Sequence, residues 1–320
     1  MAVYSVKLPN GKVAKLAFPN TVKGTHSEAH ADDFLAEIGV APEDVTAIYS
    51  ERNFCTTLRH MCAGRIGKYV NASLSWSFDK GENAWAGILN AVHGGDMIRL
   101  QEDSMDIPGA KSELSRILQT DIGELVVANR RVLPSAQAGE WRLPGADLRT
   151  LSEYGLPGPR DDELMGVVAG FQPSGESRRV HEGSRFYDLG SFGAALLAAQ
   201  EGTGRVFAFP QFTEIHPQLR HLMPEGPVPV EVNSRVFALV ECAWRWHWMV
   251  PVLAEQEVLA GKAETGAWRT ASGPEARAAL PDFFTGCRQL GELGLTGLAT
   301  FDPDVVGRDE SFWAEALLDL

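Results

Sequence analysis

A histidine, two cysteines and a glutamate in the first part of the chain have side chains suited to metal chemistry. The segment His26-Ser27-Glu28 is followed further along by Cys55 and Cys62. Three nitrogen and sulfur ligands with one open position form the arrangement of a catalytic zinc site. Zinc lowers the pKa of a bound water towards ~7, and a nearby carboxylate that is not a ligand can move the proton of that water. We expect His26, Cys55 and Cys62 to bind zinc and Glu28 to be the catalytic acid and base.

The spacing of the two cysteines restricts the structure between them. Two sulfurs that bind one zinc at ~2.3 Å lie within about 4 Å of each other. On one continuous helix, residues seven positions apart are separated by ~10.5 Å along the axis. Cys55 and Cys62 can therefore share a metal only if residues 56–61 are not helical and the next helix begins near Cys62. Thr56 and Thr57 are poor helix formers, which favours such a break.

Other ligand sets and roles fit the same segment. His30 lies four residues after the first histidine, a spacing that can bind zinc on one helical face. His60 could replace Cys62 as the third ligand. Thr25 and Glu28 also match a capping box, so the glutamate could simply cap the helix that follows.

The elements predicted around these residues place them at helix starts and strand ends. Alternation of apolar and polar residues on both sides of Pro9-Asn10-Gly11 predicts a β-hairpin, and apolar spacing predicts a helix that ends at Gly39. The apolar residues of this helix are Ala31, Phe34, Leu35 and Ile38. Further predicted elements are strands at Val45–Tyr49, Val70–Phe78 and Met97–Leu100 and helices at Cys62–Tyr69 and Asn83–Val92. This order is typical of a three-layer α/β domain with a mixed sheet.

The motif and its context resemble a known enzyme superfamily. His26-Ser27-Glu28, the stretch from Tyr49 to Cys55, and Cys62 resemble the bacterial nucleic acid and nucleotide deaminases of polymorphic toxin systems, in the Xanthomonas-type branch of the cytidine deaminase-like superfamily. The resemblance covers about the first 100 residues and implies hydrolytic deamination of cytosine bases. Members of that superfamily usually have a proline before the first cysteine and often two residues between the cysteines. This chain has Phe54 and six intervening residues. Trp76 could stack on a base or lie in the core.

Charge is distributed unevenly over a chain of net charge −13. Residues 1–150 carry 16 Lys and Arg against 18 Asp and Glu, and residues 151–320 carry 13 against 24. Nucleic-acid binders usually show a basic face, which argues against such a role for the second half. An acidic surface suits a basic protein partner. No stretch approaches the ~20 apolar residues of a membrane helix, and the first residues lack the order of a secretory signal. We therefore expect a cytoplasmic protein with no membrane partner.

The second half combines short strands with helices and shows no cluster of catalytic residues. Strands are predicted at Arg185–Leu189, Ala194–Ala199 and Arg205–Phe209, and a tryptophan-rich helix is predicted at Val236–Val252. Cys242 and Cys287 lie in apolar segments and are predicted to be core residues. Four short motifs resemble the fourth group of the SUKH immunity-protein superfamily: Leu151–Pro157, Tyr187–Gly190, Gly202–Val206 and Val232–Ser234. The resemblance implies an α+β domain that neutralises toxins by surface contact.

Taken together, the sequence predicts a two-domain protein. We expect a cytidine deaminase-like zinc domain at residues 1–108, a linker at 109–140 and a SUKH-like α+β domain at 141–320. The predicted activity is deamination of cytosine, with single-stranded DNA or a nucleotide as substrate, because a base in single-stranded DNA is already available for flipping. The second domain is predicted to bind a basic toxin. The alternative is a non-catalytic immunity protein that carries a degenerate deaminase-like domain.

Overall fold

The chain is described by a computed structural model. The structure describes residues 1–8, 10–19, 26–57, 60–78, 105–134, 138–158, 168–169, 178–308 and 311–318. The predicted helix Asn83–Val92 and the predicted strand Met97–Leu100 lie outside these residues.

The first part contains a mixed four-stranded sheet. β1 (Ala2–Lys7) and β2 (Val13–Phe18) pair antiparallel, and the chain turns at Gly11, whose φ is 78°. The predicted hairpin is therefore confirmed. β3 (Val45–Arg52) runs antiparallel to β1, and β4 (Ser73–Phe78) runs parallel to β3, so the order is β2-β1-β3-β4. This mixed sheet agrees with the predicted α/β class.

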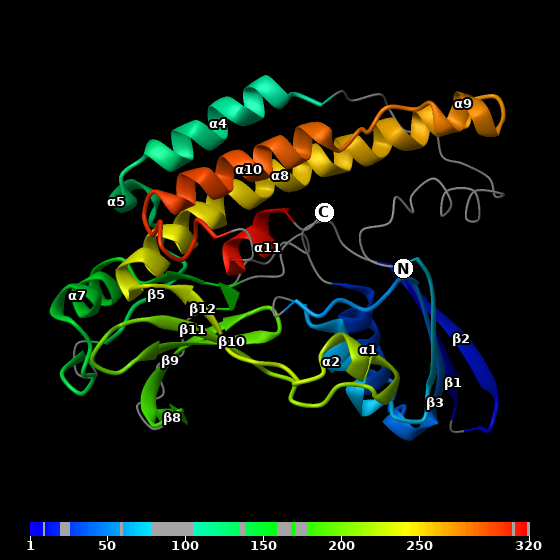
Figure 1. Cartoon of the computed structure of the whole chain (residues 1–320), viewed down its shortest axis with the longest axis horizontal. Coiled ribbons are helices and arrows are strands. Elements are labelled where there is room, and N and C mark those ends of the chain that lie inside the picture. Colours follow the sequence, from blue (N-terminus) through cyan, green and yellow to red (C-terminus); the bar gives the residue numbers. More distant parts are fainter. Residues whose placement is uncertain are drawn as a thin grey trace.

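Short helices connect these strands. They are α1 (Ser27–Glu37), the 3₁₀ helix η1 (Pro42–Asp44), α2 (Cys62–Arg65) and the 3₁₀ helix η2 (Ile66–Lys68). Figure 1 shows α1 and α2 close together beside the sheet.

The inward face of α1 differs in part from its predicted apolar stripe. Of the four predicted residues, Ala31 and Leu35 are buried, whereas Phe34 and Ile38 are 41% and 39% exposed. The buried face instead includes Glu28 and Asp32, which are 4% and 8% exposed. Asp32 is buried with a partner, because the Tyr69 hydroxyl donates to its Oδ1 at 2.6 Å. A helix can therefore turn a polar edge inward when each buried polar group is satisfied.

The second part is built on a six-stranded antiparallel sheet. Its strands are β7 (Val168–Ala169), β8 (Arg178–His181), β9 (Ser184–Phe192), β10 (Ala195–Gln200), β11 (Val206–Pro210) and β12 (Val230–Asn233). The order is β12-β11-β10-β9-β7, with β8 also paired to β9. β10 and β11 meet at a turn in which Gly202 and Gly204 have positive φ. The three predicted strands of this region are confirmed as β9, β10 and β11.

The second part also contains helices that lie to one side of this sheet (Figure 1). They are α4 (Ile107–Gln119), α5 (Ile122–Leu125), α7 (Gly145–Glu153), α8 (Val236–Thr270), α9 (Pro274–Ala278), α10 (Thr285–Ala299) and α11 (Phe312–Leu318). The two-residue strands β5 (Arg130–Arg131) and β6 (Leu156–Pro157) pair beside them. The long helices α4, α8 and α10 pack against one another (Figure 1). None of the helices in the described ranges combines the length and apolar character needed to cross a bilayer.

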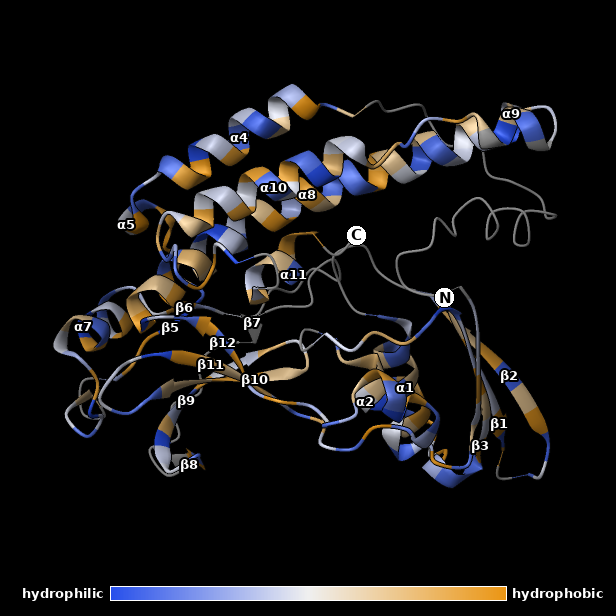
Figure 2. Ribbon diagram, viewed as in Figure 1, coloured by the Kyte–Doolittle hydropathy of each residue, from blue (hydrophilic) through white to orange (hydrophobic). Residues whose placement is uncertain are grey.

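α8 is the central helix of this part. The predicted helix Val236–Val252 is its first half, and the helix continues through Pro251 to Thr270. Trp244 and Trp246 are almost fully buried, and the Trp244 indole donates to the carbonyl of Gly155 at 3.0 Å. Figure 2 shows hydrophobic residues along β11 and the first part of α8, whereas α9 is mostly hydrophilic. The second part is therefore an α+β unit, as predicted.

Candidate metal centre

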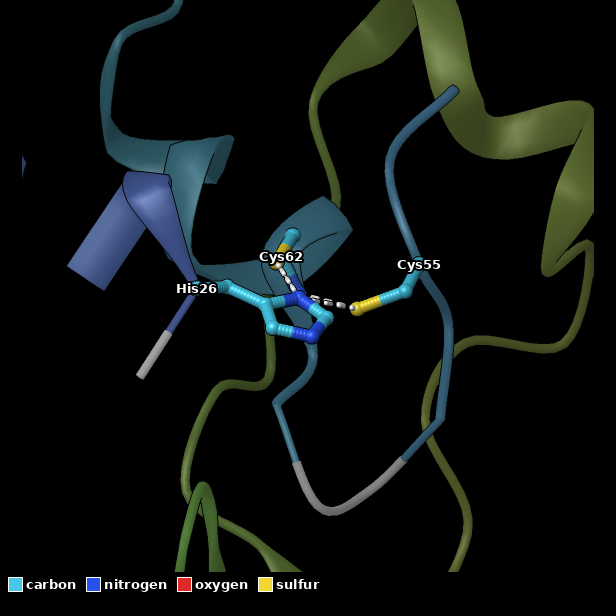
Figure 3. Close-up of side chains that lie close together, drawn as sticks. All are labelled: His26, Cys55 and Cys62. Carbon is cyan, nitrogen blue, oxygen red and sulfur yellow. Dashed lines mark hydrogen bonds between the residues drawn. The ribbon is translucent and has the colours of Figure 1, made fainter. Parts of the chain in front are cut away.

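Three separate elements bring His26, Cys55 and Cys62 together. His26 immediately precedes α1, Cys55 lies three residues after the end of β3, and Cys62 is the first residue of α2. Figure 3 shows the two cysteine side chains directed at the imidazole of His26. Within the described residues, these three form the group of His, Cys, Asp and Glu side chains that could hold a metal ion.

The distances within this group suit a single small metal ion. The ligand atoms all lie within 4.8 Å of one another. His26 Nδ1 is 3.2 Å from Cys62 Sγ and 3.6 Å from Cys55 Sγ. In a tetrahedral zinc site, with bonds of ~2.3 Å to sulfur and ~2.0 Å to nitrogen, neighbouring nitrogen and sulfur ligands lie about 3.6 Å apart. The two nitrogen–sulfur distances and the donor chemistry of one nitrogen and two sulfurs fit zinc.

The segment between the cysteines is not a continuous helix. Met61 has left-handed backbone angles (φ 46°, ψ 50°) and is fully buried, and α2 begins at the next residue. The backbone N–H of Cys62 donates to Cys55 Sγ at 3.4 Å, and the N–H of Ala63 donates to the Cys55 carbonyl at 3.0 Å. These two hydrogen bonds join the start of α2 to Cys55, so the chain between the cysteines forms a closed loop. The break in helical structure that the cysteine spacing requires is therefore present.

Glu28 lies beside the ligand group without belonging to it. The Cys62 thiol donates to Glu28 Oε2 at 3.3 Å. The Ser27 hydroxyl donates to the same oxygen at 3.3 Å, and the Ser50 hydroxyl donates to Oε1 at 3.4 Å. The carboxylate is thus buried, oriented by two hydroxyl groups and directed at the metal-binding side chains. The pattern of the sequence did not identify Ser50, because it is an ordinary small residue on β3 that meets Glu28 only in the fold.

The two thiols have opposite acidities. Hydrogen bonding with Cys62 lowers the pKa of Cys55 well below its usual value, burial opposes this effect, and His26 adds to the lowering. Burial raises the pKa of Cys62 well above its usual value, and the negative neighbours Cys55 and Glu28 raise it further. These opposite shifts make Cys55 the more acidic of the two thiols. Metal binding requires both sulfurs as thiolates, so it depends on pH.

The other residues weighed as ligands have different positions. His60 is buried, and its ring stacks on the ring of His26 with a centroid distance of 3.7 Å and an interplanar angle of 14°. His30 is half-buried on α1 and does not belong to the ligand group. Thr25, the first residue of the possible capping box, lies outside the described residues. Trp76 on β4 is half-buried and meets the ring of Phe54 edge to face.

The second part has no comparable group among its described residues. Cys242 and Cys287 are 0% and 3% exposed, as predicted for core residues. Burial raises the pKa of the Cys242 thiol well above its usual value. His216, His221 and His247 do not belong to a metal-binding group within the described ranges.

Comparisons with known families assign both parts of the chain. The family model of the Xanthomonas-like deaminases matches residues 1–88. The family model of the SUKH-4 immunity proteins matches residues 113–319. No curated protein and no solved structure matches the chain. The chain belongs to the SUKH-4 immunity protein family and carries a Xanthomonas-like deaminase domain ahead of its immunity domain.

Proposed function

We propose that residues 1–108 form a zinc-dependent deaminase that converts cytosine to uracil in single-stranded DNA. The observation that carries this proposal is the convergence of His26, Cys55 and Cys62 with a buried carboxylate beside them. A zinc ion held by these three side chains would supply Lewis-acid activation of the water that attacks the base.

Glu28 moves the protons in the proposed reaction. Water adds to C4 of cytosine, the ring nitrogen N3 is protonated, and the bond from C4 to the exocyclic nitrogen breaks to release ammonia. Glu28 takes the proton of the attacking water and delivers protons to N3 and then to the leaving amine. Its position supports this role, since the carboxylate is 4% exposed and lies 3.3 Å from the Cys62 sulfur.

Ser27 and Ser50 orient that carboxylate. Each hydroxyl donates to a different oxygen of Glu28. A general acid and base must keep its oxygens within hydrogen-bond reach of the reacting groups. Because both oxygens are held, the carboxylate keeps one orientation while it exchanges protons.

The choice of substrate follows from the family resemblance and from the energy of base flipping. A cytosine in single-stranded DNA reaches a deaminase pocket without the few kcal/mol of unpairing that a duplex requires. The test is incubation of the full chain with single-stranded DNA, double-stranded DNA, RNA and free nucleosides, scoring cytosine to uracil and adenine to inosine. Uracil formed fastest in single-stranded DNA supports the proposal, and no deamination of any substrate by zinc-loaded protein contradicts it.

For the SUKH-4 domain, we propose surface binding of a basic toxin in the cytoplasm. The excess of acidic residues in residues 151–320 supports a basic partner. A cytoplasmic location keeps the ligating thiols reduced.

A second candidate is a non-catalytic immunity protein with a degenerate deaminase domain. The observation that favours it is that the SUKH-4 match covers residues 113–319, more of the chain than the deaminase match. Zinc content distinguishes the two candidates. About one zinc per chain favours the enzyme, whereas metal-free and well-folded protein favours the second candidate.

A further inference from the structure

A segment of the immunity domain lies directly against the metal-site helix of the deaminase domain. This segment, residues 211–229, connects β11 to β12 and contains the 3₁₀ helix η3 (Pro217–Leu222). Figure 1 shows it leaving the second sheet and passing beside α2. We call it the β11–β12 segment. Its contacts involve α2, η2 and the start of β4, which are the elements that follow Cys62.

Two glycines allow the backbones to approach closely. A Cβ atom at Gly64 would lie 2.7 Å from Cβ of Phe212, and a Cβ atom at Gly67 would lie 2.6 Å from the carbonyl oxygen of Glu214. Real Cβ atoms do not approach other atoms so closely, so larger residues at these positions would push the segment away. The α2–η2 turn is therefore shaped for direct contact with the immunity domain.

A chain of contacts connects this segment to a predicted metal ligand. The guanidinium of Arg65 lies over the ring of Phe212, 5.1 Å from its centroid. Arg65 Nε donates to the carbonyl oxygen of His60 at 3.2 Å. The ring of His60 stacks in turn on the ring of His26. A planar guanidinium can stack its face on a ring while an N–H at its edge donates a hydrogen bond.

The segment is also anchored further along the chain, after Phe212. Gln218 Oε1 accepts from the backbone N–H of Leu74 on β4 at 2.8 Å. Ile215, His216 and Leu219 are buried, at 8%, 2% and 0% exposed. The β11–β12 segment is thus partly buried and is held to the deaminase domain by hydrogen bonding to β4.

We infer that the β11–β12 segment of the immunity domain is a positioning element of the metal centre in the same chain. The deaminase domain is then a binding partner of its own immunity domain. Phe212 and Arg65 are positioning residues, because they hold two parts of the deaminase domain in place. These parts are the stretch before α2, which contains His60, and the first turn of α2, which contains Cys62. This inference rests on the proposed metal site, since it assigns the segment a role in metal binding.

The test compares full-length variants that differ in the stacked ring. Phe212→Ala removes the ring, Phe212→Tyr restores a planar ring, and His221→Ala changes an exposed residue of the same segment. Zinc affinity is measured by competition with a chromophoric chelator, and the cysteine ligands are followed by the thiolate-to-metal absorption of the Co²⁺-loaded protein. Hydrogen–deuterium exchange of residues 60–72 is measured without metal.

Phe212→Ala should weaken zinc binding by about 10-fold or more, as is usual when residues that orient metal ligands are removed. It should also accelerate exchange at residues 60–72, while Phe212→Tyr and His221→Ala behave like the parent. Gln218→Leu, which loosens the same contact at β4, should accelerate exchange, and Gln218→Glu, which keeps the acceptor, should not. Parent-like zinc affinity and exchange in both Phe212→Ala and Gln218→Leu would overturn the inference. If the parent itself binds no zinc, the proposed function fails, and the exchange data of the metal-free protein still show whether the segment orders α2.

Discussion

Replacing Glu28 by glutamine should remove most of the deamination while zinc stays bound. Glutamine has nearly the same shape but cannot take up or release the proton at neutral pH. The carboxylate is outside the group of ligand atoms, so its loss does not remove a metal ligand. Both hydroxyl groups that orient it can donate to the amide oxygen or accept from the amide nitrogen, which limits any structural disturbance.

The size of the effect follows from the role of the carboxylate. A positioned general acid and base contributes typically 10²- to 10⁴-fold to the rate, or about 3 to 5 kcal/mol of activation free energy. The neighbouring Ser50 provides a graded comparison. Its hydrogen bond to Glu28 is long, 3.4 Å between the oxygens, so Ser50→Ala should cost about 1 kcal/mol, which corresponds to about a 5-fold loss of kcat.

The assay uses a single-stranded DNA that contains one cytosine and measures uracil formation under single-turnover conditions. Zinc content and thermal unfolding are measured on the same preparations. Glu28→Gln with full zinc and a parent-like rate would refute the assignment of proton transfer to this residue. Loss of zinc in Glu28→Gln would instead mean that the carboxylate takes part in holding the metal.

Three further changes test other parts of the structure. Cys62→Ser should lower zinc affinity by about 100-fold or more, because one of the three ligands is lost; metal analysis and chelator competition check this, and unchanged affinity would exclude Cys62 as a ligand. Asp147→Ala should lower the free energy of unfolding by about 2 to 4 kcal/mol, because the fully buried carboxylate accepts from the N–H of Phe237 at the start of α8 and from Arg235. Denaturant unfolding measures this loss, and a loss below about 1 kcal/mol would contradict the capping role. Burial lowers the pKa of His216 below its usual value of 6.5, although the backbone groups of Tyr69 and Ala72 oppose this. The unfolded state therefore binds more protons, and native stability falls as the pH drops below about 6.5. The thermal midpoint of the parent should drop more between pH 7.5 and 5.5 than that of His216→Gln, and equal drops would show that His216 makes no such contribution.

Local chemistry made the hairpin and the break before α2 predictable. The Asn10-Gly11 pair favours a tight turn with positive φ, and the turn occurs there. The distance that two sulfurs can span around one metal required a helix start near Cys62, and α2 begins at that residue. Both predictions depend on neighbouring residues and on fixed bond lengths.

Long-range partners made the remaining features unpredictable. Nothing near Asp32 in the sequence indicates a partner for a buried carboxylate, yet Tyr69 and Lys68 satisfy it in the fold. The predicted helix Val236–Val252 is shorter than α8, because the apolar, tryptophan-rich run that predicts it stops at Val252. The buried side of α8 continues beyond that run with residues such as Ala260.

The six residues between Cys55 and Cys62 do not by themselves argue for a degenerate site. Loop-closure entropy grows only as (3/2)RT ln n, so six intervening residues in place of two cost about 1 kcal/mol. The backbone bonds from Cys62 and Ala63 to Cys55 contribute about 1 kcal/mol each, and the complete burial of Met61 contributes about 2 kcal/mol more. The folded segment therefore offsets the entropy of its extra length. What matters for metal binding is where the sulfurs lie, and both lie within 4.8 Å of the His26 nitrogen.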